Sequence, residues 1–310
     1  MRVRDAARRG EDRHGTAVKM LRAGVVLIVV AAASAGVPAQ VATEMPNVAP
    51  VFEGWQPNAD GTFTLMFGYF NRSWQDMPLV PIGPSNRIEP GPPDQGQPTY
   101  FQPRRNHYVF RITVPADFGS KEIVWTLTTL GRTEKVYGTL KPDYVIDEMI
   151  MMSNIGAGGA LSSTPDMVGN KPPVLKVDGG TSRTIGVGQP LALGATITDD
   201  AKPATRQMPK ALGTEYILPN SAKGLRFSWF VYRGDGTRVT FDPPQSKVWE
   251  DTRDGGNSPW SAGWINPPWP PDGRHAARVT FAAPGTYTIR AIAHDGGLAS
   301  VEDVIVTVTP

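Results

Sequence analysis

The chain of 310 residues contains no cysteine. No disulfide can therefore stabilise the fold, and neither thiolate catalysis nor a thiolate metal site is available. Histidine is scarce, with four residues in all. Four local patterns of common enzyme sites are also missing: G-x-S-x-G, G-x-x-x-x-G-K-[ST], H-E-x-x-H and G-x-G-x-x-G. Nothing in the sequence thus predicts a nucleophile elbow, a phosphate-binding loop, a zinc protease site or a dinucleotide site.

The N-terminus has the pattern of an export signal. Arg22 precedes an apolar run over residues 25–33, and Val37 and Ala39 suit the −3 and −1 positions of a signal-peptidase site. We therefore expect residues 1–39 to be a signal peptide, with 1–19 a candidate for a mis-assigned start before Met20. The apolar run is shorter than the roughly 20 residues that span a bilayer. An uncleaved signal segment is the one membrane attachment that the sequence leaves open.

A strong excess of charge is absent from the rest of the chain. The first 39 residues hold seven of the 31 Lys and Arg residues and three of the 29 acidic residues. The remainder therefore carries 24 basic and 26 acidic residues, a net charge of −2. No basic patch is left to indicate nucleic-acid binding.

Short alternating strands dominate residues 47–146, which we expect to form an all-β domain of sandwich size. Apolar residues alternate in segments 62–70, 108–114 and 123–129, and a turn leads into 135–140. No segment of this block keeps a 3.6-residue period. Glycine (33) and proline (30) are both plentiful in the chain, as expected where turns join many strands.

A proline-rich loop, residues 71–106, interrupts this first block. Its eight prolines exclude it from central strands. The loop is either a stiff cover over a sheet edge or a ligand-contacting loop. In the second case Tyr100 and Phe101 are candidate ligand-binding residues.

Residues 147–171 join this block to the next. They begin with a methionine cluster, for which we expect a packing role, and continue into a Gly/Ser stretch at 156–163 that has the composition of a flexible linker. Residues 172–310 then return to short strands, expected near 183–186, 190–198, 225–232, 237–241, 277–282, 285–293 and 300–308. Seven short strands predict a second sandwich with insertions.

Several pieces of this second block occur in a family order. They are Gly188-Gln189-Pro190-Leu191-Ala192-Leu193, Ala195-Thr196-Ile197-Thr198-Asp199-Asp200, Phe227-Ser228-Trp229, the run from Val279 to Tyr287 with Pro284-Gly285, and Ala293-His294-Asp295-Gly296. Together they resemble the polycystic-kidney-disease (PKD) and related immunoglobulin-like repeats of bacterial exported proteins. The resemblance implies an immunoglobulin-like sandwich with Trp229 in its core and Tyr287 at a tyrosine corner. It also implies a candidate calcium site at one end, from Asp199, Asp200 and Asp295; the alternative is that these residues only form turns.

A Trp-rich insertion, residues 249–273, carries half of the eight tryptophans of the chain. Trp249, Trp260, Trp264 and Trp269 are candidate ligand-binding residues, because exposed indole rings stack on sugar rings and are common at protein interfaces. The alternative is a loop that packs on itself around these rings.

The sequence therefore predicts an exported, non-catalytic binding or structural module with two β-sandwiches. Its partner would be a polysaccharide or another protein, and no cofactor other than calcium is indicated. Two alternatives remain open: a glycoside-active enzyme with its site in the first domain, and a subunit of a surface assembly. Two carboxylates facing one cleft would favour the enzyme.

Overall fold

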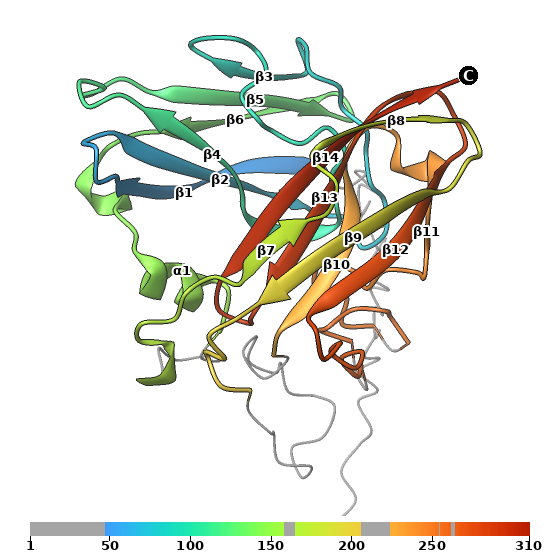
Figure 1. Cartoon of the computed structure of the whole chain (residues 1–310). Coiled ribbons are helices and arrows are strands. Elements are labelled where there is room, and N and C mark those ends of the chain that lie inside the picture. Colours follow the sequence, from blue (N-terminus) through green and yellow to red (C-terminus); the bar gives the residue numbers. More distant parts are fainter. Residues whose placement is uncertain (1–46, 158–164, 206–223, 254, 262–263) are drawn as a thin grey trace, which may run out of the picture. The chain divides into compact units, whose positions relative to one another are not determined.

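The computed structural model describes residues 47–157, 165–205, 224–253, 255–261 and 264–310. Residues 44–310 belong to one compact unit. The expected signal peptide lies outside the described residues, as does the part of the linker at 158–164. Within the described part of the chain, no helix has the length and apolar character needed to cross a bilayer. Strands dominate, as predicted, and Figure 1 shows them as two groups of sheets.

The first sandwich consists of two three-stranded antiparallel sheets. One has the order β1 (Val48–Pro57), β2 (Phe63–Asn71), β4 (Arg104–Val114), and the other β3 (Asn86–Glu89), β5 (Ile123–Thr129), β6 (Arg132–Gly138). Leu65 and Phe67 alternate into the core, where they pack with Trp125. The alternation predicted for 62–70 and 123–129 is confirmed because one face of each strand is buried between the sheets.

The second sandwich has two four-stranded sheets. One has the order β11 (Val239–Asp242), β12 (Arg274–Phe281), β9 (Leu191–Thr198), β7 (Val174–Val177); the other has β10 (Arg226–Arg233), β13 (Gly285–His294), β14 (Ala299–Thr309), β8 (Ser182–Gly186). In immunoglobulin lettering these sheets are D-E-B-A and C-F-G-A′, with β8 parallel to β14. The immunoglobulin-like fold is therefore confirmed by strand order.

Two aromatic residues have the structural roles that the sequence predicted for them. Trp229 is 1% exposed and lies in the core between the two sheets. The hydroxyl of Tyr287 donates a hydrogen bond of 3.1 Å to the carbonyl oxygen of Ala283, which makes a tyrosine corner.

The segment between the sandwiches contains a short helix, α1 (Glu148–Asn154), capped by the Asp147 carboxylate, which accepts from the Ile150 N–H at 2.8 Å. Met151 and Met152 are buried in a small apolar cluster with Met66 of β2 and Leu298 from the β13–β14 turn. The methionines therefore have the packing role expected of them. They contact residues of both sandwiches.

Candidate functional site

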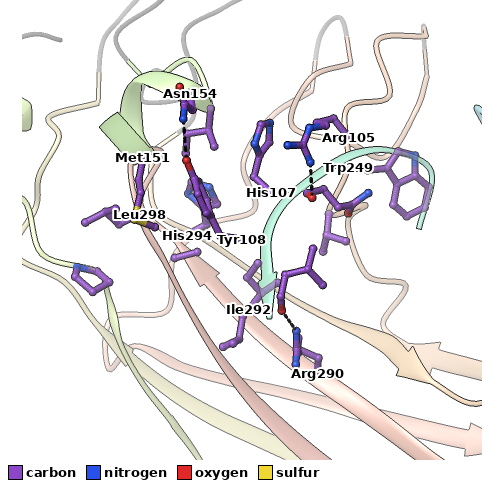
Figure 2. A pocket seen from close by; sticks show the side chains of 18 of the residues that line it. Arg105, His107, Tyr108, Met151, Asn154, Trp249, Arg290, Ile292, His294 and Leu298 are labelled. Atoms are coloured by element: carbon purple, nitrogen blue, oxygen red, sulfur yellow. Dashed lines mark hydrogen bonds between the residues drawn. The ribbon is translucent and has the colours of Figure 1, made fainter. Parts of the chain in front are cut away.

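A cavity of about 250 Å³ is lined by residues of both sandwiches. Strand β4, helix α1, strands β10 and β13, and the Trp-rich insertion contribute to its wall. Figure 2 shows side chains from these elements converging on it. We call this cavity the cleft. The residues on which its chemistry depends are Arg105, His107, Tyr108, Arg111, Glu148, Asn154, Trp249, Glu250, Trp260, Arg290 and His294.

A bulge in β4 places Tyr108 at the cleft. Phe67 pairs with Phe110 and Tyr69 with Asn106, so three residues of β4 face the single residue Gly68. The backbone of Tyr108 has a φ of 52°, in the left-handed region that a bulky residue adopts at a cost. Its hydroxyl accepts a hydrogen bond from the Asn154 amide at 3.1 Å. The alternation predicted for 108–114 is thus wrong at Tyr108, because the bulge turns this residue out of the strand pattern.

A buried carboxylate on β1 fixes the polar side of the bulge. Glu53, whose side chain is 5% exposed, accepts two hydrogen bonds of 2.7 Å from Arg105 and lies 3.5 Å from Nδ1 of His107. Burial raises the pKa of Glu53, but hydrogen bonds and charges from His107 and Arg105 outweigh it, and the pKa is lowered overall. Arg105 is therefore held by a charged partner in a fixed orientation.

Two further arginines line the cleft in different ways. Arg290 makes a two-pronged ion pair with Asp303 at 2.7 and 2.8 Å, donates to the Val109 carbonyl at 2.7 Å, and stacks on the Tyr232 ring. Arg111 is exposed as a whole residue, and within the described residues no hydrogen bond or ion pair to its guanidinium is found. Partial burial of the guanidinium and the nearby charge of Arg290 lower the pKa of Arg111, yet a guanidinium stays protonated at neutral pH. Arg111 can therefore bind an anionic or hydroxyl group of a ligand.

A neutral histidine completes the polar lining. Nδ1 of His294 accepts a hydrogen bond of 2.9 Å from the Gly296 N–H, so in the neutral ring the proton is on Nε2. Burial and the charge of Arg226 hold the pKa of His294 well below 6.5. Burial raises the pKa of the adjacent Asp295 to about 6.

This pair predicts a measurable pH dependence. His294 binds its proton less readily in the folded protein, so it removes stability as the pH falls below about 6.5. Asp295 acts in the opposite direction: its stabilising contribution is present at low pH and is lost as the pH rises through about 6. As the pH is lowered from about 7 to about 5, we therefore expect the melting temperature of His294→Asn to rise relative to that of the unsubstituted protein. If the melting temperatures of the two proteins change in parallel with pH across this range, the assignment is contradicted.

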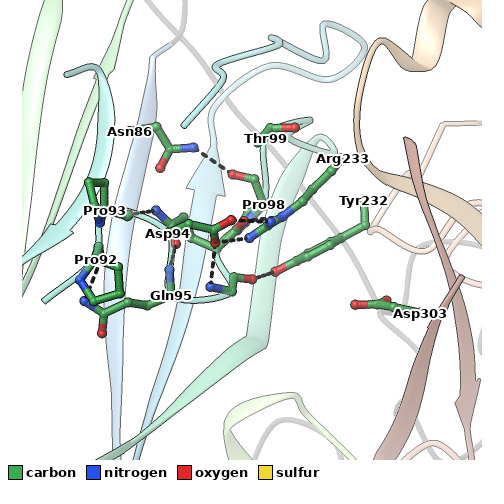
Figure 3. A network of polar contacts seen from close by, with 12 residues as sticks. Asn86, Pro92, Pro93, Asp94, Gln95, Pro98, Thr99, Tyr232, Arg233 and Asp303 are labelled. Atoms are coloured by element: carbon green, nitrogen blue, oxygen red, sulfur yellow. Dashed lines mark hydrogen bonds and ion pairs between the residues drawn. The ribbon is translucent and has the colours of Figure 1, made fainter. Parts of the chain in front are cut away.

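The proline-rich loop joins the two sandwiches. Asp94 pairs with Arg233 of β10 (Figure 3) through hydrogen bonds of 2.8 and 2.9 Å. The Tyr232 hydroxyl donates to the Gly96 carbonyl at 2.6 Å. Strand β3 within the loop also pairs with β5 as an edge strand, which fits the expected cover of a sheet edge. The loop therefore has two structural roles.

The structure corrects the expectation that Tyr100 and Phe101 contact a ligand. Phe101 is fully buried in the core of the first sandwich, and Tyr100, 7% exposed, packs in the core of the second. Neither ring is accessible, because the loop inserts them between apolar side chains of the two domains.

The four tryptophans of the insertion occupy different environments. Trp249 is 7% exposed and Trp260 is partly buried, and both line the cleft. Trp269 lines a second, smaller cavity, whereas Trp264 is partly buried and lines neither the cleft nor this second cavity. The expectation of an exposed platform is therefore wrong for Trp249, whose ring is packed.

The insertion is organised around a buried carboxylate, Asp251. It accepts hydrogen bonds from Lys247 at 2.6 Å and from Arg253 at 2.7 Å, and hydrogen bonds from Arg253 lower its pKa most strongly. The hydroxyl of Ser261 donates to the Asp251 carbonyl at 2.6 Å. The described part of the insertion is thus a self-packed loop that also presents rings to the cleft.

Turn hydrogen bonds account for the three aspartates of the expected calcium site. Asp199 accepts from the Ala201 N–H, Asp200 from the Lys202 N–H, and Asp295 from the N–H groups of Gly297 and Leu298. In the described ranges, no group of three or more His, Cys, Asp or Glu side chains is placed to hold a metal ion. Asp199 lies close enough to Asp200 and to Asp295 for their charges to interact, but the three carboxylates do not form a metal-binding group in this part of the chain.

Comparisons with known proteins place the chain in no family: no family model matches it, and no curated protein does. Among solved structures, the titin domains Z1Z2 in complex with telethonin are 12% identical, with 84% of this chain and 96% of that chain covered and a TM-score of 0.22. Domains 4 and 5 of the S-layer protein SbsC are 13% identical, with 62% and 66% covered and a TM-score of 0.23. The fold assignment therefore rests on the strand order given above.

Proposed function

We propose that the protein is an exported binding module that holds a segment of polysaccharide in the cleft between its two sandwiches. One observation carries the proposal: indole and phenol rings and unpaired or fixed polar groups line the same cavity of about 250 Å³. Sites for small molecules are concave, largely apolar and equipped with a few placed polar groups.

The lining suits a sugar chain. Tyr108 and Trp260 offer aromatic surface, against which the C–H groups of a sugar ring pack favourably, and the packed ring of Trp249 adds an apolar wall. The Asn154 amide and the Nε2–H of His294 can hydrogen-bond to sugar hydroxyls. The guanidinium of Arg111 can bind a hydroxyl or a carboxylate of the ligand. A protein partner remains the other class of ligand, and its binding would need the surface around the cleft as well.

Export and family membership form part of the same proposal. The apolar run after Arg22, with Val37 and Ala39 at the expected cleavage site, supports export to the periplasm or the outside of the cell. Trp229 in the core and the tyrosine corner at Tyr287 are features that a PKD-type repeat would have, and they support assigning residues 172–310 to that type.

The test is a binding screen of the whole protein against glycans and cell-wall polymers. For a glycan retained by the unsubstituted protein, we expect Arg111→Gln and Trp260→Ala each to weaken binding by roughly tenfold or more, because each removes a contact worth about 1.4 kcal/mol or more. Arg278→Gln on β12 and Trp264→Ala are the matched controls, since neither residue lines the cleft. Equal affinities for the Arg111 and Arg278 variants would overturn the proposal.

One observation favours a second candidate, a glycoside hydrolase. Glu148 of α1 and Glu250 of the insertion both line the cleft, and glycosidases act through a pair of carboxyl groups. Both side chains are exposed, whereas the general acid of such an enzyme needs an environment that keeps it protonated. The test is whether the protein releases reducing ends from a bound glycan. Loss of this release in Glu148→Gln or Glu250→Gln, with binding retained, would favour the hydrolase over the binding module.

A further inference from the structure

A second cavity, of about 150 Å³, opens beside the core of the second sandwich. Its wall comes from β10, from the segment after β11, from the end of the Trp-rich insertion and from β12. The lining consists of Phe227, Trp229, Pro243, Pro244, Gln245, Ser246, Asn266, Pro267, Trp269, His275 and Ala276. None of these residues lines the cleft. The cavity is therefore a separate site.

Aromatic rings form one wall of this cavity. Trp269 meets His275 with ring centroids 4.5 Å apart, and His275 meets Phe227 at 4.9 Å. Phe227 in turn meets Trp229 edge-on at 5.5 Å. The four rings thus form a continuous series of contacts, and the three prolines of the lining add rigid apolar surface.

Two polar atoms in this wall have no partner within the described residues. Trp229 is 1% exposed, and its indole Nε1 has no hydrogen-bond acceptor; Nε2 of His275 is buried and equally unbonded. Leaving such a group unsatisfied costs roughly 1–3 kcal/mol, so buried polar groups are normally bonded. The neighbouring polar side chains are already engaged: Gln245 accepts from the Trp229 backbone N–H at 3.1 Å and Ser246 bonds Ser228 at 2.8 Å. Both residues line the cavity, so a ligand that enters it is the group that could satisfy these two atoms.

Size and chemistry define the class of that ligand. A cavity of about 150 Å³ accommodates a single six-membered ring such as benzene, and exceeds the roughly 10–15 Å³ that one water needs. The indole N–H only donates, whereas a histidine nitrogen donates or accepts according to its tautomer. A hydroxyl group satisfies both atoms in either case. No Asp, Glu, Lys or Arg side chain is found in the lining, so the site favours an uncharged ligand.

We infer that this second cavity binds one neutral pyranose ring, with a ring hydroxyl between Nε1 of Trp229 and Nε2 of His275 and the sugar C–H face against Trp269. The inference does not depend on the function proposed for the cleft. It adds a second sugar site that differs from the first in charge.

The probes are methyl β-D-glucopyranoside and methyl β-D-galactopyranoside, added to the whole protein with ¹⁵N-labelled tryptophan. We expect a saturable shift of the Trp229 indole N–H resonance, assigned from its loss in Trp229→Phe. His275→Phe keeps a ring in the aromatic wall and removes Nε2, so the shift should be abolished or its apparent Kd raised at least tenfold. Because Trp229 is a core residue, His275→Phe keeps the test valid if Trp229→Phe fails to fold. Single Trp→Phe variants at the other seven tryptophans then assign the Trp229 resonance by elimination.

Arg111→Gln is the control that separates the two sites. It should leave the Trp229 shift unchanged, because Arg111 lines the cleft and not the second cavity. Absence of a saturable shift with both glycosides would overturn the inference, and so would an unchanged shift in a folded His275→Phe variant. Neither result bears on the cleft proposal, which is tested separately by the effect of Arg111→Gln on glycan retention.

Discussion

Replacement of Arg290 by methionine is expected to lower the free energy of unfolding by about 3 kcal/mol and to abolish binding at the cleft. Methionine retains much of the apolar stem but removes the ion pair with Asp303, the hydrogen bond to the Val109 carbonyl and the stacking on Tyr232. The Val109 bond joins β13 of one sandwich to β4 of the other. Its loss should therefore affect both the stability and the geometry of the cleft.

Arg278→Met provides the matched control. Arg278 also pairs with an aspartate, Asp242, at 2.9 Å, but the two side chains are 65% and 67% exposed. An exposed pair contributes at most about 1 kcal/mol, so denaturant unfolding should separate the two variants clearly. Equal losses of stability would mean that the Arg290 network does not hold the sandwiches together.

Gly68→Ala is expected to destabilise the protein by roughly 1–3 kcal/mol and to weaken glycan binding. A methyl group at this position would collide with the Glu53 carboxylate and the Asn106 backbone carbonyl. Since the backbone cannot yield easily, the carboxylate must move, and Arg105 would lose the partner that orients it. Both effects follow from one added carbon atom.

Gly186→Ala in β8 is the control for this substitution. A methyl group there would meet only the Gln189 side chain at 3.4 Å, which is an ordinary contact. Thermal unfolding and glycan binding should therefore be close to those of the unsubstituted protein. A Gly68→Ala protein with the same melting temperature and affinity as Gly186→Ala would contradict the role given to Glu53.

Much of the fold could be predicted from the sequence, because regular alternation of apolar and polar residues indicates a strand with one buried face. Strand β9 has this pattern, with Leu193, Ala195 and Ile197 buried as expected. Strands β2, β10 and β13 bury the expected core residues Leu65, Trp229 and Ile289, but residues of their other faces are buried as well. Strand β1 gave no such signal. Pro50 and a register shift between Phe52 and Gly54 break its alternation, which an edge strand tolerates.

The cleft could not be predicted in the same way, since it depends on contacts between residues far apart in the sequence. Arg111 and Arg290 each lie between apolar residues of a strand, where a charged side chain normally indicates a solvated face. Only the meeting of the two sandwiches places them together. Tyr100 shows the converse: an aromatic residue in a proline-rich loop is typical of a binding loop, yet it packs in the core of the other domain.

The Trp-rich insertion was recognised from composition, but composition does not reveal which rings face a cavity. The Asp251 network orients the insertion, and that network depends on Lys247, Arg253 and two serines whose partners lie across the loop. Trp249 and Trp260 therefore line one cavity and Trp269 another.

A crystal structure of the protein with the tightest-binding oligosaccharide from the glycan screen tests the central claim most directly. The cleft proposal predicts a sugar ring between the aromatic side chains of Trp260 and Tyr108, with Arg111 within hydrogen-bonding distance of the glycan. An oligosaccharide bound outside the cleft, with the cleft empty, would contradict it.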